Sequence, residues 1–212
     1  MNVRMDNSSD FLTLLNERHA VKVFDDNYRM NEDIIRSLLQ SASKAPSAWN
    51  LQHWKFVVVT EQTHKEILYK SAYGQRQIVE ASVVVVILGD LQANRNAEKV
   101  MESDLKAGQM SPEIKRNLIS QIEQAYTHPV WARDQAICNA SLAAMQLMLA
   151  AKAMGLDTCP MGGFDSNKLV EDFAIPNRYV PIMLVAVGKA AKPARPSLRL
   201  PIEEIIVWNR FE

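Results

Sequence analysis

The chain has 212 residues, of which 48% are hydrophobic and 23% are charged, a composition that excludes collagen-like, disordered and disulfide-rich classes. Its 24 lysines and arginines balance 24 acidic residues, so no overall field favours nucleic acid or an anionic membrane. The two cysteines, Cys138 and Cys159, lack metal-ligand spacing, and the N-terminal residues lack the apolar core of a signal peptide. We therefore expect a cytoplasmic protein without a metal site, a nucleic-acid partner or a membrane anchor.

The first half of the chain is predicted to alternate helices with buried strands. Apolar residues at helical spacing, and apolar runs without alternation, are typical of these two elements. The elements expected are helices over residues 10–18 and 31–44 and strands over residues 54–60 and 81–88. Ser8 and Ser9 are candidate caps of the first helix, and Ala45-Pro46-Ser47 ends the second.

The second half is predicted to be mostly helical. Ser111 followed by Pro112 indicates a helix start and predicts a helix to about Tyr126. A longer helix begins at Pro129, and its part over residues 137–154 carries a single charge. That part approaches the length of a membrane span, but its small and polar residues favour a helix in the core or at a subunit interface. Further elements are a helix over residues 166–173, a strand over residues 180–187 and a possible strand over residues 202–208.

The few strands and long helices predict an α+β fold, in which helices wrap one sheet, as a single domain over residues 1–212. The chain has neither a GxGxxG motif after a strand nor a GxxxxGK[ST] motif. A Rossmann dinucleotide site and a P-loop are therefore disfavoured.

Three separated segments carry unusual polar groups. The first holds Arg18, His19 and Lys22 at the end of the first predicted helix, where cations also simply complement the helix dipole. The second is the loop APSAWNLQHW before the first strand, whose Asn50 and Gln52 can read the edge of a heterocycle or form an Asx-type turn.

The third segment is CPMGGF, in which Gly162 and Gly163 either let the backbone approach a flat ligand or form a plain turn. Residues 173–202 beyond it contain cations and no acidic residue, as expected of an anion site or of a solvated basic tail. These cations are Arg178, Lys189, Lys192, Arg195 and Arg199.

In combination, these motifs resemble the FMN-dependent nitroreductase family over residues 11–199. Arg18-His19-Ala20-Val21-Lys22 resembles the family's R-x-S-x-[R/K] motif, and residues 45–54 resemble [A/S]-P-S-x-x-N-x-Q-P-W. A glutamine-rich segment, Gly74-Gln75-Arg76-Gln77, the Gly-Gly turn and Arg199-Leu200-Pro201 follow in the family's order. Three positions depart from the family: Ala20 replaces serine, His53 replaces proline, and Gly162 stands where some members have glutamate.

The resemblance implies a nitroreductase-like fold with a mainly antiparallel mixed sheet, in an intertwined homodimer whose two FMN sites are each lined by both chains. It implies phosphate contacts for Arg18 and Arg199, a contact with the pyrimidine end of the ring for Lys22, and hydrogen bonds from Gln75, Gln77 and the partner's Asn50. The full set of implied cofactor contacts is Arg18, His19, Ala20, Lys22, Pro46, Ser47, Ala48, Asn50, Gln75, Gln77, Pro160, Met161, Gly162, Gly163 and Arg199.

The resemblance also implies a ping-pong oxidoreductase. NADH or NADPH reduces flavin N5, and a nitroaromatic, quinone or similar flat acceptor then enters the same slot, whose walls include Trp49 and Trp131. The chemistry is the cofactor's, so no catalytic side chain is implied. Other readings are a flavin-fragmenting or reductive dehalogenating branch of the same superfamily, or a flavin-binding module without turnover.

Overall fold

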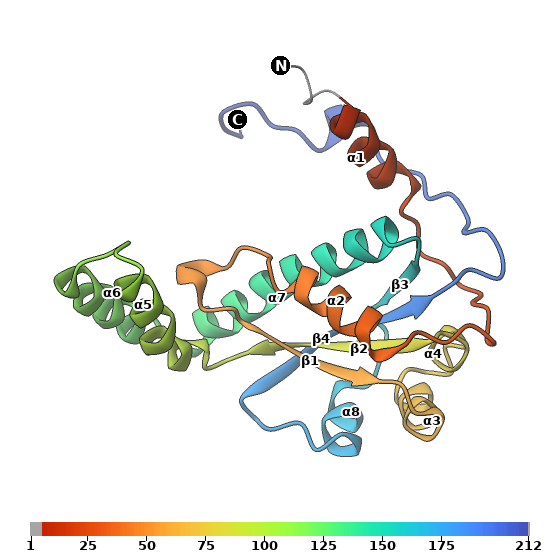
Figure 1. Ribbon diagram of the computed structural model, residues 1–212, viewed down its shortest axis with the longest axis horizontal. Coiled ribbons are helices and arrows are strands. Elements are labelled where there is room, and N and C mark those ends of the chain that lie inside the picture. Colours follow the sequence, from red (N-terminus) through yellow and green to blue (C-terminus); the bar gives the residue numbers. More distant parts are fainter. Residues whose placement is uncertain (1–5, 212) are drawn as a thin grey trace.

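A computed structural model describes residues 6–211 (Figure 1). Its helices are α1 (Asp6–Glu17), α2 (Glu32–Ala42), α3 (Gln62–Ser71), α4 (Gln77–Glu80), α5 (Ala97–Lys106), α6 (Pro112–Ala125), α7 (Pro129–Ala153) and α8 (Ser166–Asp172). Its strands are β1 (Trp54–Val59), β2 (Val83–Asp90), β3 (Asp157–Met161) and β4 (Tyr179–Gly188). Short 3-10 turns are η1 (Ala48–Asn50), η2 (Ala93–Asn96) and η3 (Ile202–Glu204). The predicted α+β class is confirmed.

The four strands form one sheet in the order β1-β2-β4-β3, and every neighbouring pair is antiparallel. An isolated parallel bridge joins Ala20 to Thr158 beside the edge strand β3. The mainly antiparallel sheet is therefore as expected.

Both faces of the sheet are covered by helices, as the continuous apolar runs predict. Every residue of β2 is buried. Its Val84 and Val86 pack with Leu68 of α3, and its Val83 and Val85 pack on the other face with Leu147 of α7. Strand β1 lies at an edge and is only partly buried.

Helix α7 is a core helix. Within residues 6–211 it is the one helix with the length and hydropathy of a membrane span. One face, which includes Ala136, Ala140 and Ala144, is fully buried, and the helix contacts α2 and all four strands of the sheet. The small side chains let α7 approach the strands closely: a Cβ on Gly89 of β2 would lie 3.0 Å from the carbonyl oxygen of Ala136.

Three sequence expectations differ from the structure. Helix α1 begins at Asp6, so Ser8 and Ser9 lie inside it and not at its cap. Residues 202–208 form a 3-10 turn and an irregular segment, because a strand needs a hydrogen-bonding partner. Strand β3 was not predicted, since Pro160 and the glycines after it favour a turn; a proline is tolerated there because β3 is an edge strand.

The chain ends in an extended arm, residues 191–211, which runs away from the sheet towards α1 (Figure 1). Its large apolar side chains are exposed: Leu198 at 96%, Trp208 at 82% and Phe211 at 84%. Phe11 and Leu12 of α1 are also more than half exposed. Large apolar side chains on the arm and on α1 thus remain uncovered in the described single chain, and exposed apolar patches commonly mark interaction sites.

Candidate functional site

The first predicted segment lies along the edge strand β3. Helix α1 ends at Glu17, and the next residues are extended: the Val21 amide donates to the Thr158 carbonyl at 3.0 Å, and Ala20 bridges Thr158. This pairing brings Arg18, His19 and Lys22 beside the strand that carries Cys159 and Pro160. Two segments far apart in the sequence thus form one side of a site.

Side-chain hydrogen bonds join this side to the glutamine segment and the Gly-Gly turn. The Lys22 ammonium donates to Cys159 Sγ at 3.3 Å. Gln77 Nε2 lies 3.8 Å from the same sulfur and 3.2 Å from Gln75 Oε1. Gln75 Nε2 donates to the Gly163 carbonyl at 2.7 Å. We call the segments 18–22, 75–77 and 159–163 the cradle.

The Gly-Gly turn leaves the cradle open on one side. A Cβ added at Gly162 would have no heavy atom within 4 Å, and one at Gly163 would lie 3.9 Å from Gln75 Nε2. Met161 is buried in the core below the turn, and Pro160 is partly exposed. The turn therefore presents backbone groups to open space, as a planar ligand requires.

The second predicted segment is a strained turn at a different place. Trp49, Asn50 and Gln52 have φ values of 50°, 55° and 54°, a left-handed conformation that costs free energy in residues other than glycine. Hydrogen bonds to side chains help to hold it: the Ala48 amide donates to Asn139 Oδ1 at 2.9 Å, and the Gln52 amide donates to Ser47 Oγ at 2.9 Å. We call residues 46–53 the amide loop. Such strain is typical of functional sites.

Aromatic rings pack against one another at the amide loop. The ring centroids of Trp49 and Trp131 lie 5.7 Å apart, and those of Tyr126 and Trp131 lie 5.4 Å apart in an edge-to-face arrangement. His53 stacks on Tyr126 at 6.5 Å. The two predicted slot walls, Trp49 and Trp131, are therefore in one cluster, to which Tyr126 and His53 also belong.

His53 is fully buried, and its two ring nitrogens have no hydrogen-bond partner within residues 6–211. Burial lowers its pKa from 6.5 to about 4, although Asp90 opposes the shift. Burial likewise raises the pKa of Tyr126. The His53 ring thus stays neutral at pH 7. The sequence singled out His53 only as a departure from a motif, and its structural role in the loop was missed.

Asp90, whose amide donates to the His53 carbonyl at 2.9 Å, carries an ion pair beside this cluster. The Arg178 guanidinium binds its carboxylate in a bidentate manner, at 2.8 Å and 2.6 Å, which raises the pKa of Arg178. Of the basic residues in segment 173–202, Arg178 therefore has a structural partner and is not part of an anion site.

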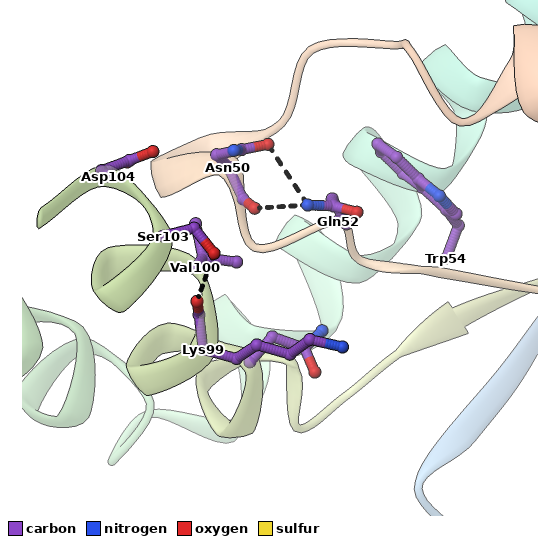
Figure 2. Close-up of a pocket in the computed structure, with 8 residues that line it drawn as sticks. Asn50, Gln52, Trp54, Lys99, Val100, Ser103 and Asp104 are labelled. Atoms are coloured by element: carbon purple, nitrogen blue, oxygen red, sulfur yellow. Dashed lines mark hydrogen bonds between the residues drawn. The ribbon is translucent and has the colours of Figure 1, made fainter. Parts of the chain in front are cut away.

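A polar cleft of about 340 Å³ borders the amide loop. Figure 2 shows Asn50 and Gln52 on one side of it and Lys99, Ser103 and Asp104 of α5 on the other. Gln52 Nε2 donates to the Asn50 carbonyl at 3.3 Å. The amide loop thus presents polar side chains to the surface on the side of the protruding helices α5 and α6.

The cradle and the amide loop lie at opposite ends of α7 (Figure 1): the cradle beside β3, which follows α7, and the amide loop near Trp131 in its first turns. Within residues 6–211 no hydrogen bond joins them. Arg199 is in neither, because it lies on the arm, where its guanidinium bonds carbonyls of Ser197 and Leu198. The structure therefore gathers the predicted residues into two groups and leaves Arg199 apart.

Comparisons with known proteins agree on one family. The model of the nitroreductase family matches residues 15–189. The chain is 50% identical, over 93% of its length and 98% of the relative's, to Bacillus subtilis YodC, whose name assigns it provisionally to the NAD(P)H nitroreductases. It is 31% identical to the CLA biosynthesis enone reductase of Lactiplantibacillus plantarum, over 87% of the chain and 88% of that protein.

A solved structure extends this similarity. The crystal structure of an Exiguobacterium sibiricum 255-15 protein, provisionally titled a nitroreductase and in complex with FMN, is 32% identical with a TM-score of 0.88, over 94% of this chain and 97% of that one.

Proposed function

The chain belongs to the nitroreductase family, and from that premise we propose that it is a cytoplasmic, FMN-dependent NAD(P)H oxidoreductase. The acceptors we propose are nitroaromatics, quinones and similar flat conjugated molecules. When bound, FMN would supply the redox chemistry of a ping-pong sequence, namely hydride acceptance from the nicotinamide and two-electron transfer to the acceptor.

The cradle is the observation that carries this proposal, because its chemistry fits FMN. It combines a lysine ammonium, two amide side chains and an open Gly-Gly turn in one hydrogen-bonded group. Amides can both donate to and accept from the edge of a flavin ring, and an ammonium stabilises negative charge on it. A Cβ at Gly162 would project into the open side. The donor set thus suits a flat, electron-poor heterocycle.

In this proposal the cations have separate tasks. Arg18 lies at the end of the cradle and is partly buried, and Arg199 lies on the arm. Guanidinium groups bind phosphate oxygens in pairs, so we assign both to the FMN phosphate. Lys22 lies beside Cys159 in the middle of the cradle, and we assign it to the pyrimidine end of the ring.

We also propose that the site is completed by a second copy of the chain. The cradle and the amide loop are far apart in one chain, so an intertwined homodimer would place the partner's amide loop over the cradle. The exposed apolar arm supports this arrangement: Leu200, Ile202 and Trp208 are at least half exposed. The edge strand β1 is bordered by a groove with Arg36, Leu39 and Phe56 in its lining, a surface suited to an apolar partner segment.

Acceptor entry would be controlled by the amide loop. Trp49 and Trp131 offer aromatic faces against which a flat acceptor can stack, with few polar groups to select among acceptors. The permissive slot is consistent with the variety of relatives, one of which is named as an enone reductase.

The test is spectroscopic. The purified protein should bind FMN with flavin absorbance bands, and NADH or NADPH should bleach them in the absence of oxygen. Adding a quinone should then restore the colour. A protein that binds no FMN would overturn the proposal, and a yellow protein that neither nicotinamide reduces would be a binding module without turnover.

A further inference from the structure

Cys159 lies at the centre of the cradle, although the sequence assigns no role to its side chain. Its side chain is fully buried in β3. Two donors approach its sulfur from different segments: the Lys22 ammonium at 3.3 Å and Gln77 Nε2 at 3.8 Å. The sulfur is therefore the atom at which the cation and the glutamine pair of the cradle meet.

The contacts continue beyond the sulfur as one series of hydrogen bonds. Gln77 Nε2 also donates to Gln75 Oε1, and Gln75 Nε2 donates to the Gly163 carbonyl. One end of this series of contacts is thus the Lys22 ammonium, and the other is the Gly-Gly turn. Lys22 is exposed and bonds Cys159 Sγ, so the sulfur restricts a side chain that otherwise has large rotamer freedom.

We propose that Cys159 is a positioning residue: its sulfur holds the Lys22 ammonium and the Gln77 amide in the orientation that the reduced flavin requires. This inference rests on the proposed function, since it assigns the effect to FMN. Reduction adds negative charge to the pyrimidine end of the ring. A Lys22 ammonium held in place favours reduced over oxidised FMN, whereas a freely moving one is solvated and favours it less.

A purely structural role makes a different prediction. Cys159 also packs among apolar core residues such as Met161 and Leu184, and buried cysteine commonly acts as a small apolar residue. Serine and alanine have nearly the same volume, but only serine keeps a hydrogen-bond acceptor at Cβ. If Cys159 only packs, Cys159→Ala and Cys159→Ser should have the same flavin properties, and serine should be the less stable because it buries a hydroxyl.

The test compares these two variants by the ratio of the FMN dissociation constants in the reduced and oxidised states. We expect Cys159→Ala to weaken reduced FMN relative to oxidised FMN by three- to tenfold, where tenfold corresponds to about 30 mV in the two-electron potential. Cys159→Ser should stay within about twofold of the wild type, since its hydroxyl accepts the same hydrogen bonds. Cys138→Ala, on the exposed cysteine of α7, is the matched control and should change nothing.

A second readout needs no flavin. Brief labelling of the unliganded chain with acetic anhydride, followed by peptide mass spectrometry, measures the reactivity of Lys22 against the exposed Lys70. We expect Lys22 to react about threefold faster in Cys159→Ala and at the wild-type rate in Cys159→Ser. Equal behaviour of the two variants in both readouts would overturn the proposal. If no variant and no wild type binds FMN, the proposed function fails, and the labelling alone decides whether the sulfur holds Lys22.

Discussion

The cradle and the amide loop differ in how they are held. The cradle is joined by side-chain hydrogen bonds between three segments, from Lys22 through Cys159 and Gln75 to the Gly163 carbonyl. The amide loop is held in a left-handed backbone conformation over a partly buried aromatic cluster. One chain thus keeps the cradle and the amide loop apart, which is why we propose that two chains associate to complete the site.

The largest effect should come from removing the arm that would connect two chains. A chain ending at Ser197 loses the exposed residues Leu198, Trp208 and Phe211 together with Arg199. We expect it to sediment as a monomer and to lose FMN binding, because a site built from two chains cannot be completed by one. A truncated chain that stays dimeric and keeps its FMN affinity would separate the arm from the site.

The buried histidine should make the stability of the amide loop depend on pH. The pKa of His53 is about 4 in the folded chain against 6.5 when solvated, so the folded state favours the neutral ring. Stability is therefore complete above pH 6.5 and falls as the pH drops to 4, by up to about 3 kcal/mol. Urea denaturation of His53→Phe should show a smaller loss between pH 7 and pH 4.5 than the wild type.

His64 is exposed, so His64→Phe is the control. Its stability should depend on pH in the same way as that of the wild type. An unaltered slope in His53→Phe would mean that other groups cause the acid sensitivity.

How far the sequence predicts these two regions depends on the kind of contact. Motifs placed Arg18, Lys22, Gln75 and Gly163 in one site, and the structure brings together the three segments that carry them. Cys159 and His53 were not assigned roles, because a buried thiol and a buried imidazole have no local pattern and depend on tertiary neighbours. The strand expected over residues 202–208 is absent from the described single chain, since no strand lies beside it to accept its hydrogen bonds.

Smaller effects should follow from neutralising the proposed phosphate contacts, one in the cradle and one on the arm. Arg18→Ala and Arg199→Ala should each weaken FMN binding by about 2 kcal/mol, close to 30-fold, since each removes a charge-assisted hydrogen bond and leaves a phosphate oxygen unpaired. Fluorescence titration measures the loss. Arg210→Ala, on the same arm, should bind FMN normally; unchanged affinity in both test variants would refute the assignment.

The smallest expected effect distinguishes Lys22 from these arginines within the cradle. Lys22→Met keeps the stem and removes the charge that would stabilise the reduced flavin. We expect the two-electron potential to fall by tens of millivolts, where 30 mV corresponds to about 1.4 kcal/mol, with slower reduction by NAD(P)H and nearly normal FMN affinity.

Dye equilibration measures the potential, with Lys70→Met as the control. If Lys22→Met instead kept its potential but lost FMN, Lys22 would be a third phosphate contact.

We propose that each site joins the cradle of one chain to the amide loop of its partner. Complementation tests it directly, with Arg18→Ala disabling the cradle and Asn50→Glu placing an anionic side chain in the amide loop. Each variant alone should bind FMN weakly. In a purified heterodimer of the two, a shared site predicts one defective site and one composed of two intact halves, so FMN titration should find one tight site per dimer. Uniformly weak binding by the heterodimer would contradict the account, because it would mean that both halves of each site come from the same chain.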